Sequence, residues 1–216
     1  MRLRLFIVAL IVALLGGGLG AAAWAWQLRS IARQTQFDQY IGPAALENNI
    51  DPLLIRAIIW RESRFQPRVR GLNRERGLMQ LTPGVAAEWA RVRQVDPVDP
   101  DALFDPKVNI EIGTWYFARM LKHWEGVENA EVFALAEYNA GRSNVLKWVD
   151  PAAPTDAAAL HDRIGFPSTR RYVDAILVKY EAYQRNYFRP PWLLYWDRLT
   201  KKSDQPTLVG SAAKAL

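Results

Sequence analysis

The sequence contains no cysteine and only two histidines among its 216 residues. Without cysteine the chain can form no disulfide and no thiolate zinc site, and it offers no lipid-modified cysteine at a cleavage site. The two histidines, His123 and His161, lack the paired spacing that indicates a metal site. We therefore expect no metal and no other cofactor, and a fold that depends on its apolar core.

Long alternating strand patterns are also missing, and so are internal repeats. Proline instead follows Asp or Thr at several points, which is typical of a helix start because proline suits the first helical position and Asp or Thr caps it. Helices are expected to begin at Pro52, Pro83 and Pro106, and further helices are expected over 130–138, 142–149 and 169–187. The sequence thus predicts an all-α domain in which residues 69–78 form a loop that could contain a short hairpin.

The chain begins with an apolar run. Residues 5–26 carry no charge over about 22 positions, enough to cross the roughly 30 Å core of a bilayer. Trp24 and Trp26 stand where an aromatic belt would lie. The run fits an uncleaved signal anchor in the inner membrane, or a secretory signal peptide cut near residues 23–25. Both interpretations predict an exported protein, either tethered to the inner membrane or released into the periplasm.

The expected division of the chain is 1–36 for the signal or anchor helix and a short linker, 37–188 for the folded domain, and 189–216 for a C-terminal segment. That last segment opens with the aromatic stretch RPPWLLYWDRL and ends in a small and polar tail that we expect to be disordered. We expect the aromatic stretch to pack back on the domain, with a membrane surface or a partner protein as alternative contacts.

The formal net charge is +6. A basic exported protein can meet an anionic polymer such as cell wall, lipid head groups or nucleic acid, and charge alone does not choose among them. Five arginines cluster between two expected helices and are expected to form a solvated loop: Arg64, Arg68, Arg70, Arg74 and Arg76. No recognition helix or RNA-binding aromatic pattern is present in the sequence, so no nucleic-acid partner is expected.

A carboxylate interrupts an apolar helix in the stretch IIWRESRFQP, residues 58–67. A helix that begins at Pro52 and ends before Pro67 places Glu62 near its last turn, in the row of Ile58. The partial negative charge of a helix C-terminus and partial burial both raise the pKa of such a group. A carboxylic acid that stays protonated near neutral pH can act as a general acid. The alternative is a solvent-facing Glu62 paired with a neighbouring arginine.

Three further stretches place polar or aromatic groups near expected helix ends. GLMQLTP contains Gln80, whose amide can bind a sugar hydroxyl or another amide. AEYNAG offers Tyr138 and Asn139 before a glycine that suits a helix C-terminus. TRRYVDAIL contains Tyr172. Taken singly, each stretch can be explained as ordinary core or as a helix end.

Taken together and in this order, the four stretches resemble the lytic transglycosylase family, whose soluble-lytic-transglycosylase (SLT) catalytic domain is related to goose-type lysozyme. The resemblance rests on NNIDPLLIRAIIWRESRFQP, GLMQLTP, LFDPKVNIEIGTWYFARML and ALAEYNAG. It implies a mostly helical, lysozyme-like fold and a peptidoglycan-cutting enzyme. By position it implies Glu62 as the single catalytic acid/base. It also implies a set of residues that support the site or hold the sugar: Ser63, Met79, Gln80, Tyr138, Asn139 and Tyr172.

The chain departs from the family pattern at two points. The family often has Glu-Thr before the last arginine-containing segment, whereas this chain has Ser168-Thr169, so a cleft carboxylate is expected to be missing. Glu137 replaces a residue that is usually small, and we expect it to face solvent. Two other carboxylates, Glu75 in the arginine-rich loop and Glu111 on a long helix, are expected to be surface partners of arginine.

The resemblance implies a reaction with one acid, although most glycosidases use two carboxylates. Glu62 would protonate the oxygen between N-acetylmuramic acid (MurNAc) and N-acetylglucosamine (GlcNAc), then take a proton from the C6 hydroxyl and so close a 1,6-anhydro ring. Two alternatives stay open: a lysozyme-type hydrolase on the same fold, and a weakly active wall-binding or assembly-scaffold protein. Expected partners are peptidoglycan glycan strands, the inner membrane through residues 5–26, and cell-envelope assembly proteins.

Overall fold

The computed structural model describes residues 18–186 except 19 and 23. They belong to two units, one that ends at Asp38 and one that begins at Gln39. In the first unit, residues 24–35 are helical. The expected membrane segment, 5–26, lies mostly outside the described residues. The C-terminal segment, 189–216, lies wholly outside them. No helix within the described part is long and apolar enough to cross a bilayer.

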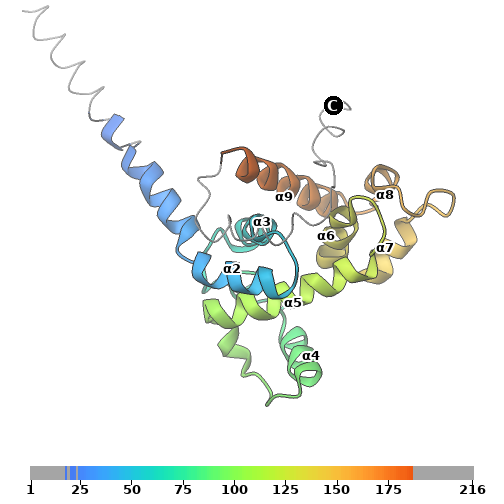
Figure 1. Cartoon of the computed structure of the whole chain (residues 1–216), viewed down its shortest axis with the longest axis horizontal. Coiled ribbons are helices and arrows are strands. Elements are labelled where there is room, and N and C mark those ends of the chain that lie inside the picture. The colour runs from blue at the N-terminus through green and yellow to red at the C-terminus, as the bar shows by residue number, and fades with distance from the viewer. Residues whose placement is uncertain (1–17, 19, 23, 187–216) are drawn as a thin grey trace, which may run out of the picture. The chain divides into compact units, whose positions relative to one another are not determined.

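Helices joined by loops make up the second unit (Figure 1). Those helices are α2 (Asp38–Glu47), α3 (Pro52–Ser63), α4 (Pro83–Arg93), the 3-10 helix η1 (Pro100–Phe104), α5 (Pro106–His123), α6 (Ala130–Ala140), α7 (Arg142–Trp148), α8 (Ala157–Arg163) and α9 (Pro167–Asn186). The described residues include no sheet, and isolated bridges pair Arg76 with Arg70 and with Leu81. The prediction of an all-α domain is confirmed for this part of the chain, and of the short hairpin considered at 69–78 the structure has only the isolated Arg70–Arg76 bridge.

The helix starts predicted at Pro52, Pro83 and Pro106 are confirmed. Asp51 caps α3, because its carboxylate accepts a hydrogen bond from the backbone N–H of Leu53 at 2.8 Å. The cap and the proline together set the first turn of α3. Because the start of α3 is fixed, Glu62 comes to lie in its last turn.

α3 is apolar and buried along most of its length. Figure 1 shows it nearly end-on, with α9 and α2 on either side. It packs against α9, while α6 packs against both α5 and α9. A helix that is apolar on most of its surface belongs in the core. Its buried apolar residues are Leu53, Leu54, Ile55, Ala57, Ile58 and Ile59.

The chain leaves α3 by a sharp turn. Arg64 and Phe65 adopt φ angles of 53° and 61°, in the left-handed region that ends a helix. Phe65 is buried, which anchors the turn. Beyond it, the Arg76 N–H donates to the Leu81 carbonyl at 2.9 Å and the Leu81 N–H donates to the Arg76 carbonyl at 3.1 Å. This pairing folds residues 66–82 into a compact loop between α3 and α4.

Candidate active site

An open cavity of about 400 Å³ lies at the C-terminal end of α3. Its walls come from α3, the loop before α4, the start of α4, and the facing sides of α5 and α6. A cavity of this size falls within the range of small-molecule binding sites. The lining residues include Glu62, Glu75, Gln80, Tyr116, Tyr138 and Asn139.

Glu62 occupies the last turn of α3 and is partly buried. The hydroxyl of Tyr172, from α9, donates a hydrogen bond to Glu62 Oε1 at 2.6 Å. The ring of Tyr172 is fully buried, so this hydroxyl is held in place by core packing. The guanidinium of Arg61 lies over the same ring, 5.2 Å from its centre. Residues 110 positions apart in sequence thus meet at one carboxyl group.

Burial raises the pKa of Glu62 from its ordinary 4.5 to about 7. The hydrogen bond from Tyr172 and the positive charge of Arg61 act in the opposite direction, because both favour the carboxylate, and the negative charge of Glu75 adds to the increase. The prediction of a raised pKa is confirmed. Glu62 can therefore both give up and take up a proton near neutral pH.

Tyr138 and Met79 are connected by a hydrogen bond across the cavity wall. The Tyr138 hydroxyl donates to the Met79 carbonyl at 2.8 Å. The Met79 N–H donates to Asn109 Oδ1 at 2.7 Å, and Asn109 Nδ2 in turn donates to the carbonyls of Arg76 and Leu103, each at 2.8 Å. This buried network holds the 76–79 segment against α5.

Gln80 lines the cavity, but its amide hydrogens are already used. Its Nε2 donates to the Gly77 carbonyl at 2.7 Å and to the Val69 carbonyl at 3.2 Å. The residue also has a φ of 50°, which is uncommon for a side chain with a Cβ. Its Oε1 is the amide atom that these two bonds leave available to accept a hydrogen bond.

The amide of Asn139 is oriented by the first turn of α9. Thr169 Oγ1 donates to Asn139 Oδ1 at 2.8 Å, which leaves the Asn139 NH₂ group to donate elsewhere. Thr169 is buried, whereas its neighbour Ser168 is exposed and is not part of the cavity wall. Ser63 Oγ donates to the Ile59 carbonyl at 3.2 Å, within α3 itself.

The expectation that Glu75 is a surface partner of arginine was wrong. Glu75 lines the same cavity as Glu62. Its carboxylate accepts bonds from the backbone N–H of Asn73 at 2.7 Å and from Asn73 Nδ2 at 3.0 Å. The loop places this side chain at the cavity, which sequence spacing in a loop does not indicate. Glu111, on α5, is not among the cavity residues.

The expectation that Glu137 faces solvent was also wrong, because only 3% of it is exposed. Its carboxylate bonds His123 Nδ1 and Trp124 Nε1, both at 2.8 Å, and pairs with Arg142 at 3.4 Å. Glu137 therefore joins the end of α5 to α6 and α7, and three polar partners compensate for its burial.

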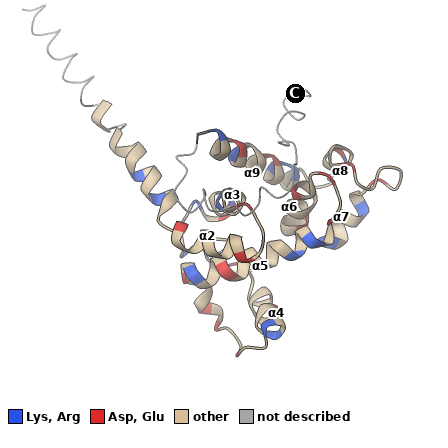
Figure 2. Ribbon diagram, viewed as in Figure 1, with Lys and Arg blue, Asp and Glu red and all other residues tan. Residues whose placement is uncertain are grey.

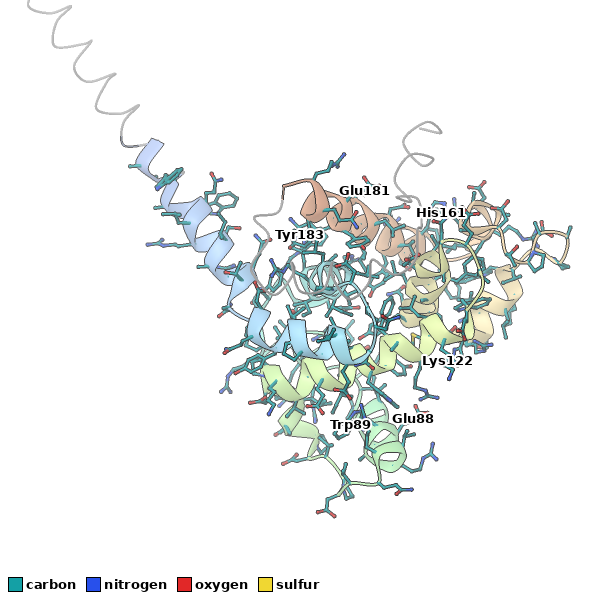
Figure 3. The ribbon with its side chains drawn as sticks, viewed as in Figure 1. Glu88, Trp89, Lys122, His161, Glu181 and Tyr183 are labelled. Carbon is teal, nitrogen blue, oxygen red and sulfur yellow. The ribbon has the colours of Figure 1, made fainter. Side chains whose placement is uncertain are left out.

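Each histidine bonds a carboxylate. His123 bonds Glu137, and His161 Nε2 bonds Asp174 Oδ1 at 2.7 Å. His161 lies on α8 (Figure 3). Within the described residues, no group of three or more potential metal ligands is found.

Two residues of the site were missed from the sequence. Tyr116 lines the cavity and lies 5.7 Å, centre to centre, from the ring of Tyr138. Asn109 is fully buried and holds Met79. A signal for Asn109 was available, since a polar residue on the buried face of a helix requires hydrogen-bond partners.

A helical domain with a protonatable carboxyl group in a cleft at the end of its central helix belongs to the lysozyme-like class. The sequence model of the family described as "Transglycosylase SLT domain" matches residues 39–160. The chain belongs to this family, and the resemblance drawn from its four motifs is confirmed.

Two protein sequences and one crystal structure show the extent of the similarity. Soluble lytic murein transglycosylase of Escherichia coli K12 is 37% identical over 157 residues, which cover 72% of this chain and 22% of that protein. Membrane-bound lytic murein transglycosylase F of Desulfosudis oleivorans is 32% identical over 120 residues, or 54% of this chain and 24% of that protein. The crystal structure of the 70 kDa soluble lytic transglycosylase of E. coli matches with a TM-score of 0.63 at 30% identity, covering 73% of this chain and 25% of that one. This chain thus spans about a quarter or less of each of them.

Proposed function

We propose that this protein is a peptidoglycan lytic transglycosylase. It cleaves the β-1,4 bond between MurNAc and GlcNAc and leaves a 1,6-anhydro-MurNAc end, with Glu62 as the single group that transfers protons. The observation that carries the proposal is the pKa of Glu62, raised to about 7 by burial in the wall of an open cavity. Membership of the SLT family supports the same chemistry.

The reaction proceeds in two proton transfers. The protonated Glu62 gives its proton to the bridging oxygen as the bond from that oxygen to the MurNAc anomeric carbon breaks. The GlcNAc end leaves with that proton as a hydroxyl. The carboxylate of Glu62 then takes the proton of the MurNAc C6 hydroxyl while O6 bonds the anomeric carbon. Glu62 ends in its starting form, and no water is consumed.

The remaining predicted residues receive supporting roles. Tyr172 orients the carboxyl group of Glu62 through its 2.6 Å hydrogen bond. Gln80 and Asn139 offer an acceptor and a donor to sugar hydroxyl or acetamido groups. Tyr138 holds the Met79 backbone at the cavity wall. Ser63 keeps its hydroxyl bonded within α3 and acts structurally.

We further propose that the domain works outside the cytoplasm, where peptidoglycan lies. The uncharged run at 5–26 supports export and either tethering or cleavage. Assembly proteins of the cell envelope remain proposed partners.

The variant Glu62→Gln tests the role of Glu62. It keeps the size and the hydrogen bond from Tyr172 but has no proton to transfer. We expect the release of soluble fragments from purified peptidoglycan to fall by about 10²- to 10⁴-fold. Glu111→Gln, outside the cavity, is the matched control and should release fragments at the rate of the unaltered protein. Fragment release by Glu62→Gln at the rate of that control would contradict the proposal.

A further inference from the structure

Glu75 is a second carboxylate in the wall of the proposed active site. It reaches the cavity from the loop between α3 and α4, whereas Glu62 reaches it from α3. Both its oxygens are oriented by Asn73, one by the backbone N–H and one by the side-chain amide. Among the described residues, no arginine or lysine forms an ion pair with it. The negative charge is thus held in place without being neutralised.

Glu75 and Glu62 differ in protonation. Partial burial raises the pKa of Glu75, but hydrogen bonds from its own backbone N–H and from the side chain and backbone of Asn73 outweigh it, and the net pKa is lowered. Burial instead raises the pKa of Glu62 to about 7. Near pH 6 one group is therefore ionised while the other carries a proton. Two carboxyl groups with separated pKa values in one cavity can take different chemical roles.

The space in front of Glu75 is kept open by Gly71. A Cβ on Gly71 would lie 2.9 Å from Gln80 Oε1 and still closer to Glu75 Oε2. Glu75 Oε2 and Gln80 Oε1 therefore face the same small volume beside Gly71. Because the Gln80 amide hydrogens are bonded to the Val69 and Gly77 carbonyls, this part of the wall presents acceptor oxygens. Such a wall favours a hydroxyl group or a positively charged carbon.

We propose that Glu75 is a second catalytic carboxylate, whose negative charge stabilises the positive charge that develops at the anomeric carbon when Glu62 protonates the bridging oxygen. This inference rests on the proposed function. Glu75 forms no bond and exchanges no proton. The broken bond, the leaving hydroxyl and the return of the C6 proton to Glu62 are unchanged, and the effect of Glu75 is electrostatic.

Preorganised charge is effective in such a position. A carboxylate that its hydrogen bonds already orient does not have to reorganise during the reaction. Glu75 also acts on Glu62, whose pKa its charge raises. The other groups that face Glu62 are Arg61 of α3, Tyr172 of α9 and the neutral Tyr138 of α6.

The test uses the full chain, a soluble glycan fragment of alternating GlcNAc and MurNAc, and the variants Glu75→Gln and Glu75→Asp. For Glu75→Gln we expect kcat to fall about 10- to 100-fold while KM changes about threefold or less, because the interaction exists mainly in the transition state. In a plot of kcat against pH, the fall on the alkaline side should move to lower pH, since removing a negative neighbour makes Glu62 ionise more readily. We call this fall the alkaline limb. Glu75→Asp should restore part of kcat and move the limb back. Glu111→Gln is the control for a charge lost elsewhere.

An unchanged kcat in Glu75→Gln would overturn the inference and leave the role of Glu62 intact. A fall in kcat with an unmoved alkaline limb and no rescue by Glu75→Asp would also overturn it, because that pattern indicates a disturbed loop. Failure of the proposed function looks different: the unaltered protein and Glu62→Gln would then act alike.

Discussion

The carboxyl group of Glu62 is under opposing influences. Burial raises its pKa to about 7, while the Tyr172 hydroxyl and Arg61 lower it. The Tyr172 bond limits the increase because it favours the ionised form. The Tyr172 hydroxyl therefore helps to keep the pKa of Glu62 near 7, so that the carboxyl group can be protonated or ionised near neutral pH.

Replacing Tyr172 by Phe removes this hydroxyl and keeps the buried ring. We expect the pKa of Glu62 to rise further, so that the alkaline limb of the kcat profile moves to higher pH. The maximum of kcat should fall about 10-fold, since the carboxyl group loses its orientation. The measurement is a pH series of fragment release from a soluble glycan. An alkaline limb displaced to lower pH would contradict the assignment.

Glu62 also makes stability depend on pH. Its pKa is raised from 4.5 to about 7 by folding, so between these values the native state holds a proton that the unfolded state has lost. The free energy of unfolding therefore falls as pH rises through this window. Above it, ionised Glu62 costs the fold up to roughly 3 kcal/mol.

Glu62→Gln should remove this cost. We expect the variant to gain stability over the unaltered protein at pH 8, by about 1–3 kcal/mol, and to gain almost nothing at pH 4. Urea unfolding at the two pH values measures the difference. The same gain at both would show that a change in packing, and not in protonation, is responsible.

The junction of α3 and α9 positions the two partners of the Glu62–Tyr172 bond. Besides capping α3, Asp51 accepts a hydrogen bond from the Tyr180 hydroxyl of α9 through Oδ2, at 2.6 Å. One carboxylate therefore sets the start of one helix and fixes the other against it. α9 therefore runs antiparallel to α3, and its N-terminal part, which carries Tyr172, lies at the end of α3 that lines the cavity.

Asp51→Ala should cost about 2 kcal/mol of unfolding free energy, about 1 from the cap and about 1 from the Tyr180 bond. Asp156→Ala is the matched control, because Asp156 caps α8 through Ala158 and Ala159. It should cost about 1 kcal/mol. The free energy of unfolding of both variants is measured with denaturant. Equal losses in the two variants would show that the hydrogen bond from Tyr180 contributes nothing.

Six helices of the second unit, α3 to α7 and α9, could be predicted from sequence because their signals are local, whereas α2, η1 and α8 were not predicted. Asp-Pro and Thr-Pro pairs mark three of the starts, and apolar spacing places Glu62 in the final turn of α3. The position of Glu75 in the cavity wall could not be predicted. It depends on the pairing of Arg76 with Leu81 and on Asn109, whose side chain holds a backbone 30 or more residues away. Burial of Glu137 likewise depends on His123 and Trp124, from the preceding helix.

Across the whole chain, positive charge exceeds negative charge by six. Figure 2 shows Lys and Arg on several helices of the second unit, including α4, α5, α7 and α9. Three exposed arginines, Arg68, Arg70 and Arg74, belong to the loop whose other residues line the cavity. A positive rim there would raise the local concentration of a polymer that carries carboxylates.

Replacing Arg68, Arg70 and Arg74 together by Gln should weaken the dependence of activity on salt. We expect KM at low ionic strength to rise about 3- to 10-fold and to differ little from the unaltered protein above about 0.5 M salt. Peptidoglycan digestion over a salt series measures this. A triple replacement of exposed Lys122, Lys147 and Arg91, outside the cavity wall, is the control for net charge. An unaltered salt dependence in the first variant would contradict a role for the rim.

The central claim is that the glycosidic bond is cut without water, through a proton that Glu62 gives and takes back. The most direct test is a digest of purified peptidoglycan by the full chain in water enriched in ¹⁸O, with the soluble products read by mass spectrometry. The account predicts products one water lighter than hydrolytic ones, with no ¹⁸O in them, and their loss in Glu62→Gln. Hydrated products that carry one ¹⁸O at the new end would contradict it and identify a lysozyme-type hydrolase on the same fold.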